Sequence, residues 1–246
     1  MRYLITFSYD GSAFNGFQRQ KNKKTVQGEI EKILFTLSGK KINIHASGRT
    51  DTGVHALNQK AHFDLDMDIK INNLKMFLNR KLKGEIYIKD ICVVADSFHA
   101  RYNVVSKTYI YKINTLEFDP FLKNYVYQYN KPIDISLLNN ASTYFLGEKD
   151  FRALCKKESE KENCVRCISK MDISSNDGIV TIEISADGFL RGMVRVIVGI
   201  LLDINSGKKK VSDIDKILLS KSRTHNTKLA IAEGLYLKEV NYIKNS

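Results

Sequence analysis

Short segments of alternating apolar side chains, separated by stretches with helical spacing, constrain the fold of this chain most. Alternation places successive side chains on opposite faces of a strand, whereas apolar residues three and four positions apart line one face of a helix. The first half therefore predicts the order strand, helix, strand, helix, strand. The expected elements are strand 2–10, a helix after the cap residue Thr25 with Val26, Ile30, Ile33, Leu34 and Leu37 on one stripe, a strand with Leu57, Gln59, Ala61, Phe63 and Leu65 on one side, helix 72–81 and strand 86–95.

The second half repeats this type of pattern without repeating the sequence. The expected elements are strand 107–115 with Tyr109, Tyr111 and Ile113 on one face, helix 136–147 starting at Ser136, strand 178–186 with Val180, Ile182, Ile184 and Ala186 inward, a helix near 189–205 with Val194, Ile197, Val198 and Leu201 inward, and strand 234–243. We therefore expect an α+β fold with two ferredoxin-like α/β lobes, residues 1–105 and 106–246. Each lobe should carry mixed, mainly antiparallel sheet flanked by helices.

Basic side chains exceed acidic ones throughout the chain, whose formal net charge is +12. Residues 1–105 hold 17 Lys and Arg against 10 Asp and Glu, and residues 106–246 hold 22 against 17. Such a balance favours a polyanionic partner, because each phosphate neutralised by a basic side chain releases condensed counterions. An anionic membrane surface fits the charge as well, and an AT-rich genome would raise the lysine content without any functional reason.

No run approaches the roughly 18 uninterrupted apolar residues that a membrane-spanning helix needs. The start, MRYLITFSYDGS, enters an alternating pattern directly and lacks a signal-peptide cleavage region. We therefore expect a cytoplasmic protein.

Three of the four cysteines, Cys155, Cys164 and Cys167, have the spacing C-x8-C-x2-C. Zinc usually takes four thiolate or imidazole ligands, and a fourth is missing nearby. The charged segment between Cys155 and Cys164 is also unlike a compact zinc knuckle. We expect ordinary reduced thiols here and no metal.

The densest group of functional side chains is the segment Gly48-Arg49-Thr50-Asp51-Thr52-Gly53-Val54-His55. Its glycines permit tight turns and close approach of a ligand, so the loop can present a carboxylate at a cleft. By itself the segment also fits a structural turn in which Arg49 only pairs with Asp51.

Three further segments bear on this choice: Tyr9-Asp10-Gly11-Ser12-Ala13-Phe14-Asn15-Gly16-Phe17-Gln18-Arg19-Gln20, Phe98-His99-Ala100-Arg101-Tyr102 leading into Lys107-Thr108-Tyr109, and Phe189-Leu190-Arg191-Gly192-Met193-Val194-Arg195 followed by Glu233-Gly234-Leu235-Tyr236-Leu237. Together with GRTDTGVHA they resemble the motif set of the tRNA pseudouridine synthase A (TruA) family. The resemblance runs in the family's order from residue 3 to about residue 242, nearly the whole chain.

The resemblance implies a role for four residues. Asp51 matches the catalytic aspartate, and Arg49 matches the arginine implicated in drawing the target base out of the helix. Tyr109 matches the tyrosine that stacks on the target uracil, and Arg195 matches the basic residue that pairs with the aspartate. The resemblance further implies an active-site cleft between the lobes, uridines 38 to 40 of the tRNA anticodon stem-loop as targets, and a homodimer.

The chemistry of this reaction agrees with these residue types. Pseudouridine forms when the bond from ribose C1′ to uracil N1 breaks and a bond to C5 replaces it, so no cofactor is required. A carboxylate can attack the sugar carbon and leave again, or it can remove a ribose proton to give a glycal. Either role requires an ionised Asp51, and the guanidinium of Arg195 would keep it ionised. Arg191, one helical turn before Arg195 in the expected helix, fits the same cleft or a phosphate contact.

Some residues depart from the family pattern or have a simpler explanation. Residues 78–83 (LNRKLK) replace a more familiar Asn-Ala-Asn-Leu-Pro and add three cations, and the usual proline before Glu233 is missing. His55 and His99 are better interpreted as structural histidines bonded to nearby backbone than as acid–base partners. Three alternatives to the tRNA enzyme stay open: a paralogue that modifies other uridines such as those of ribosomal RNA, a non-catalytic RNA-binding protein, and a metal enzyme that uses the cysteines.

Overall fold

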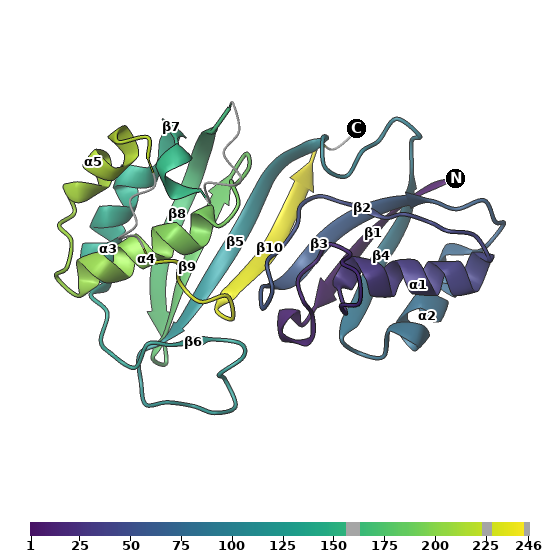
Figure 1. Ribbon diagram of the computed structural model, residues 1–246, viewed down its shortest axis with the longest axis horizontal. Coiled ribbons are helices and arrows are strands. Elements are labelled where there is room, and N and C mark those ends of the chain that lie inside the picture. The colour runs from purple at the N-terminus through teal and green to yellow at the C-terminus, as the bar shows by residue number, and fades with distance from the viewer. Residues whose placement is uncertain (156–162, 223–227, 244–246) are drawn as a thin grey trace. The chain divides into compact units, whose positions relative to one another are not determined.

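The computed structural model describes residues 1–155, 163–222 and 228–243. These residues form two compact units (Figure 1). The first consists of Met1–Val105 with the described residues from Tyr236 onward, and the second of Ser106–Leu235. The expected division placed residues 106–246 together, but the structure assigns the last strand to the first unit. Tyr236 and Leu237 of this strand pair in parallel with His55 and Ala56.

The first unit contains a mixed sheet in the order β4-β1-β3-β10, with the short β2 on β3. β1 pairs antiparallel with both β3 and β4, so that Ile5 lies between Ala61 and Ile91. Helices α1 and α2 pack on each other (Figure 1), and α2 also packs on β4. The elements are β1 (Arg2–Tyr9), the 3-10 helix η1 (Gly11–Ala13), α1 (Val26–Ser38), β2 (His45–Ala46), β3 (His55–Asp64), α2 (Ile71–Leu82), β4 (Ile86–Val94) and β10 (Leu235–Tyr242).

The apolar periodicity explains the core of this unit. Alternate residues of β1, from Tyr3 to Tyr9, are buried, whereas Thr6 and Ser8 between them are only half-buried. The side chain of Thr25 accepts a hydrogen bond from the amide of Gly28 and caps α1 as expected. Burial of the apolar stripes of the two helices completes the core: Val26, Ile30, Ile33 and Leu34 from α1, and Leu74, Leu78 and Leu82 from α2.

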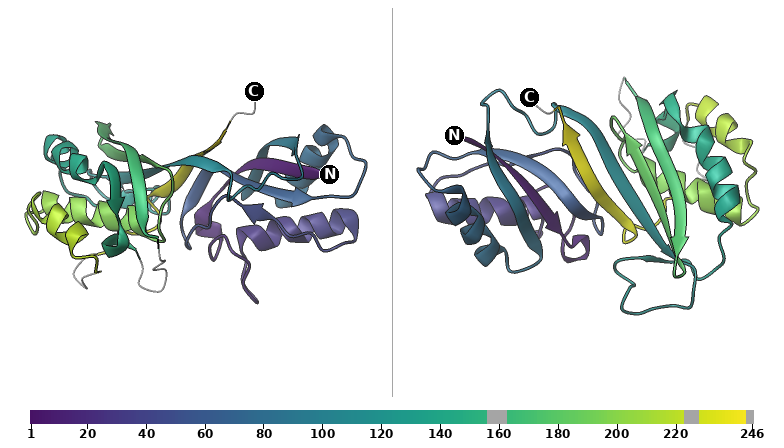
Figure 2. Two further views of the ribbon diagram at one scale, coloured as in Figure 1. Left: turned by 90° about the horizontal axis from the view of Figure 1, so that it is seen from above. Right: turned by 180° about the vertical axis from the view of Figure 1, so that it is seen from behind.

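The second unit contains the strands β5-β9-β8-β7 in this order, with the short β6 parallel to β5. β9 pairs antiparallel with β5 and with β8. In Figures 1 and 2 the helices α3, α4 and α5 lie together on one side of β8 and β9. The elements are β5 (Val104–Asn114), β6 (Tyr127–Gln128), α3 (Ile135–Ser142), η2 (Thr143–Phe145), β7 (Gly147–Asp150), η3 (Arg152–Leu154), β8 (Val165–Asn176), β9 (Ile179–Ala186), α4 (Met193–Asn205) and α5 (Asp213–Leu219).

Helix α4 is the centre of the second core. Arg195 in its first turn and Asn205 at its end are half-buried, and all other residues of the helix are buried. A helix that is apolar on nearly all sides is one that the rest of the protein surrounds, and its one buried carboxylate, Asp203, pairs with Lys209. The inward face of β9 is buried as predicted, and the register places Tyr109 opposite Ile184 and Tyr111 opposite Ile182 on the same face.

The predicted α+β class with mixed, mainly antiparallel sheet flanked by helices is confirmed. Two helix starts were wrong. α3 begins at Ile135 because the side chain of Asp134, and not that of Ser136, caps it, and it ends at Ser142 before the 3-10 turn η2. α4 begins at Met193 and not near residue 189, because Gly192 has a φ of 78°, outside the helical region. Strands β7 and β8 and helix α5 were not predicted.

Candidate active site

Asp51 lies in the loop that connects β2 and β3 in the first unit, and this loop is tied to β1 and to the segment after it. The hydroxyl groups of Thr50 and Tyr9 are 2.8 Å apart in a buried hydrogen bond. The carbonyl of Thr50 accepts the amide of Phe17 at 3.1 Å, and the amide of Val54 donates to the carbonyl of Asp51 at 3.2 Å. The residue immediately before the carboxylate is therefore fixed through both its side chain and its backbone.

Two glycines of the motif Tyr9–Gln20 allow the backbone of this motif to lie close to the loop that carries Asp51. A Cβ atom on Gly11 would lie 2.2 Å from the carbonyl oxygen of Val54, too close for any side chain. Gly16 has a φ of +85°, and a Cβ atom there would lie 3.2 Å from the carbonyl oxygen of Thr50. This motif thus forms the support on which the loop with Asp51 rests.

A second set of contacts holds the beginning of the loop. The hydroxyl of Ser47 donates to the side-chain carbonyl of Gln59 at 2.6 Å, and the Gln59 amide donates to the carbonyl of Gly48 at 3.2 Å. Gln59 is fully buried and belongs to β3, so the loop is attached to the sheet at this point as well. Between these attachments Arg49 is exposed and Asp51 is half-buried. A half-buried carboxylate on a fixed loop is suited to act on a bound substrate.

Tyr9 is part of this support and not an acid–base group. Its ring is buried against Phe14 and Phe17. Burial, opposed only in part by hydrogen bonds to Thr50 and Gln59, raises the pKa of Tyr9 to about 12. Its hydroxyl therefore stays neutral at physiological pH. Sequence reasoning did not single out Tyr9, Thr50 or Gln59, because their contacts join segments far apart in the chain.

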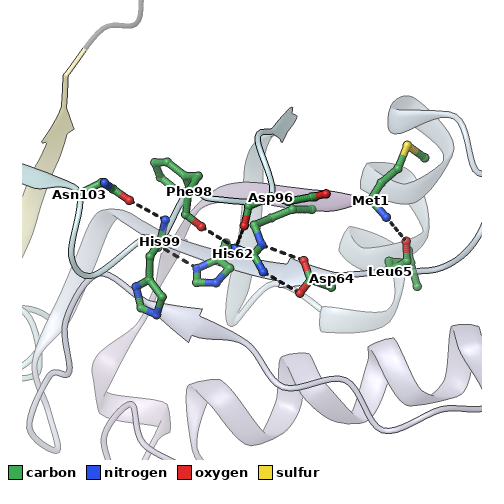
Figure 3. A network of polar contacts seen from close by, with 10 residues as sticks. Met1, His62, Asp64, Leu65, Asp96, Phe98, His99 and Asn103 are labelled. Atoms are coloured by element: carbon green, nitrogen blue, oxygen red, sulfur yellow. Dashed lines mark hydrogen bonds and ion pairs between the residues drawn. The ribbon is translucent and has the colours of Figure 1, made fainter.

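The rings of His55 and His99 each bond to a nearby backbone amide, as expected for structural histidines. The Nδ1 atom of His55 accepts the amide of Gly11 at 3.0 Å, and its ring stacks on Tyr236 with the centroids 4.5 Å apart. The Nδ1 atom of His99 accepts the amide of Arg101 at 3.1 Å. Figure 3 shows the ring of His99 beside that of His62, with the centroids 4.7 Å apart.

The second unit contains the other two predicted residues. Tyr109 on β5 is half-buried, and its ring meets that of Phe189 edge-on with the centroids 5.1 Å apart. Arg195, in the first turn of α4, is half-buried as well, and its Nε atom donates to the carbonyl of Ala230 at 2.6 Å. The structure thus places Asp51 and Arg49 on one loop of the first unit, and Tyr109 and Arg195 in the second unit.

The expected relation of Arg191 to Arg195 was wrong. Arg191 precedes α4, in the turn that the amide of Met193 closes on the carbonyl of Leu190 at 3.1 Å. The two arginines are therefore not one helical turn apart.

The segment 78–83 contributes both to the core and to the charged surface of the first unit. Leu78 and Leu82 are core residues of α2, and the side chain of Asn79 bonds both the amide and the carbonyl of Ile88. The three additional cations Arg80, Lys81 and Lys83 are exposed at the C-terminal end of the helix. The sequence change therefore alters a charged surface and leaves the packing of the helix intact.

Cys155 and Cys164 are buried and Cys167 is half-buried, while residues 156–162 of the intervening segment lie outside the described residues. Among the described residues no three His, Cys, Asp or Glu side chains are grouped so that they could hold a metal ion. Within the same ranges no helix is long and apolar enough to cross a membrane.

Comparison with known proteins agrees with the motifs. A family model described as tRNA pseudouridine synthase matches residues 5–103 and 141–243. A tRNA pseudouridine synthase A of Caldicellulosiruptor bescii is 41% identical over 240 residues, which cover 97% of this chain and 98% of that protein. A protein of the same name from Staphylococcus aureus is 38% identical over 249 residues, covering 100% of this chain and 93% of the relative. The tRNA pseudouridine synthase A 2 of Bacillus cereus is 40% identical over 242 residues, or 98% and 99% of the two chains.

The matches extend over both units, including the loop of Asp51, strand β5 in the pairwise comparisons, and helix α4. The chain belongs to the tRNA pseudouridine synthase family.

Proposed function

We propose that this protein converts uridine to pseudouridine in the anticodon stem-loop of tRNA, at positions 38 to 40, with Asp51 as the catalytic carboxylate. The observation that carries the proposal is the fixed loop around Asp51 in a chain whose relatives, matched end to end, are tRNA pseudouridine synthases. The family indicates the reaction, and the loop supplies a carboxylate whose backbone is held by hydrogen bonds on both sides.

The reaction needs no redox partner and no second substrate. The bond from C1′ to N1 breaks, the base turns, and a bond from C1′ to C5 forms. The proton on C5 is then lost and N1 gains one, so the atoms of uridine are conserved. Asp51 must be ionised to attack C1′ or to remove a ribose proton, and we assign Arg195 the role of keeping it ionised.

The target base must leave the stacked helix before this chemistry can begin. We assign Arg49, exposed on the same loop as Asp51, to the displacement of the base. We assign Tyr109 to stack on the displaced uracil, a contact worth about 1–3 kcal/mol per base.

Two further features complete the proposal. The excess of 39 Lys and Arg over 27 Asp and Glu provides the attraction to the tRNA backbone. We also propose the homodimer that the resemblance to this family implies, and a cytoplasmic location for this chain.

The test is release of tritium from unmodified tRNA labelled at C5 of uracil. We expect the wild-type protein to release tritium and Asp51→Ala to release none, because the label leaves only when the new bond forms. Asp66→Ala is the matched control, since it removes a carboxylate of the same unit whose side chain is 97% exposed. Tritium release by Asp51→Ala at the wild-type rate would refute the assignment of the carboxylate.

A second substrate deserves a parallel assay, because Arg80, Lys81 and Lys83 change an exposed surface of α2. Release from ribosomal RNA with none from tRNA would identify a paralogue that acts on other uridines. No release from either RNA by folded protein would refute the proposed reaction and favour an RNA-binding protein without this activity.

A further inference from the structure

The motif Glu233–Leu237 has no part in the function proposed above, yet the segment before it touches the residue assigned to pair with the catalytic carboxylate. Residues 228–234, here termed the crossing segment, pass between α4 and β5 within the second unit. Two successive carbonyl groups of the crossing segment accept hydrogen bonds, that of Ala230 from α4 and that of Ile231 from β5.

On the side of α4 the crossing segment holds Arg195 by two hydrogen bonds. The Nε atom of Arg195 donates to the carbonyl of Ala230 at 2.6 Å, and the amide of Ala230 donates to the carbonyl of Arg195 at 3.0 Å. One turn further along the helix, a Cβ atom on Gly199 would lie 2.0 Å from the carbonyl oxygen of Lys228. A glycine is therefore required for the segment to lie against α4.

On the side of β5 the next carbonyl is held by Tyr111. Its hydroxyl donates to the carbonyl of Ile231 at 2.9 Å. The amide of Lys112 donates to the carbonyl of Gly234 at 2.8 Å, and a Cβ atom on Gly234 would lie 2.9 Å from the ring of Tyr111. The missing side chain of Gly234 thus lets the segment rest directly on the Tyr111 ring.

The surroundings of Tyr111 keep its hydroxyl protonated, so that it can donate to the carbonyl of Ile231. The side chain is fully buried, and burial holds the pKa of Tyr111 above its usual range, although the positive charge of Arg195 opposes this. A neutral phenol donates its proton to a carbonyl, whereas a phenolate could not. The bond to Ile231 is therefore present throughout the physiological pH range.

We propose that Tyr111 is a positioning residue for Arg195: its hydroxyl fixes the crossing segment, and the neighbouring carbonyl of Ala230 in turn fixes the guanidinium. The inference rests on the proposed function, in which Arg195 keeps Asp51 ionised. A guanidinium held through Nε keeps its remaining N–H groups pointing in one direction. Loss of the Tyr111 hydroxyl frees the Ile231 carbonyl and lets the acceptor of Arg195 move.

The experiment compares Tyr111→Phe with Tyr127→Phe. The control removes a hydroxyl from the ring that meets Tyr111 edge-on, with the centroids 6.4 Å apart. In the tritium-release assay we expect Tyr111→Phe to lower kcat on the order of 10-fold, since a small misplacement of a catalytic group has effects of this size or larger. KM for tRNA should stay within about twofold, and Tyr127→Phe should match the wild type in both constants.

Two measurements distinguish positioning from a general loss of structure. In the Arg195→Lys background, Tyr111→Phe should cause no further loss, because lysine lacks the Nε–H group that Ala230 accepts. The NMR signal of the Arg195 Nε–H group, assigned by its absence in Arg195→Lys, should shift in Tyr111→Phe and stay in place in Tyr127→Phe.

The inference is overturned if Tyr111→Phe behaves as Tyr127→Phe does, if its effect adds fully to that of Arg195→Lys, or if the Nε–H signal does not move. Wild-type protein that releases no tritium would instead refute the proposed function. The NMR comparison would still show in that case whether Tyr111 holds Arg195.

Discussion

The hydrogen bond between Tyr9 and Thr50 offers the most direct test of how the loop of Asp51 is held. Thr50→Val keeps the shape of the side chain and removes its hydroxyl. Both residues are buried, with 5% and 8% of their surface exposed, so the Tyr9 hydroxyl loses one of its two partners away from water. A buried polar group left without a partner costs about 1–3 kcal/mol.

We expect a value in the lower half of this range, because Gln59 also interacts with the Tyr9 hydroxyl and still does so in the variant. The expected loss is therefore about 1–2 kcal/mol. In a chain of this size, each kcal/mol lost lowers the melting temperature by about 2–4 °C. Tyr9→Phe leaves the Thr50 hydroxyl without its partner and should cost a similar amount. The double variant removes both groups and should be more stable than the sum of the single effects predicts.

Thermal unfolding followed by circular dichroism measures these free energies, and tritium release at a temperature where every variant is folded measures function. Activity should fall in Thr50→Val, because this residue directly precedes Asp51. Full additivity of the two single variants, together with wild-type activity in both, would show that the bond does not fix the loop.

Three further predictions follow from the same contacts. Gly16→Ala should destabilise the protein by about 1–2 kcal/mol, because the residue has a left-handed backbone, and it should also reduce tritium release. The control is Gly39→Ala, where φ is +68° and a Cβ atom would meet nothing within 4 Å. It should destabilise the protein in the same way and leave tritium release unchanged. Burial, followed by the charges of His99, His45 and Arg2, lowers the pKa of His62 from 6.5 to about 4. The unfolded chain therefore binds this proton more tightly, so the free energy of unfolding should be highest above pH 6.5 and should decline toward pH 4. Urea titrations of His62→Gln should show a shallower decline. Neutralising Arg80, Lys81 and Lys83 together should weaken tRNA binding and flatten its dependence on salt, whereas an unchanged salt dependence in filter binding would exclude this surface from the RNA contact.

Local patterns were sufficient for much of the fold. The alternation in residues 178–186 correctly identified the buried face of β9, and Thr25 correctly marked the start of α1. Both features depend on neighbours in the sequence, which is why they could be read from it. The start of α3 was predicted wrongly, because Asp134 and Ser136 are both good caps and only the backbone decides between them.

The candidate site divides in the same way. The motif around Asp51 pointed to the family, and the comparisons agree with that prediction. What the motif did not reveal is its support: Tyr9 lies 41 positions before Thr50 in the sequence, and Ala230 lies 35 positions after Arg195. Contacts at such separations leave no periodicity in the sequence.

The sequence by itself determined the α+β class, the positions of most strands and helices, and the family, since these follow from periodicity and from motifs of adjacent residues. Only the tertiary structure decided that β10 pairs with β3 of the first unit, that glycines 11 and 16 let the chain approach the loop of Asp51, and that Tyr111 and Arg195 bind neighbouring carbonyls. Each of these contacts joins segments that are far apart in the sequence, and the packing of side chains in the folded protein brings those segments together.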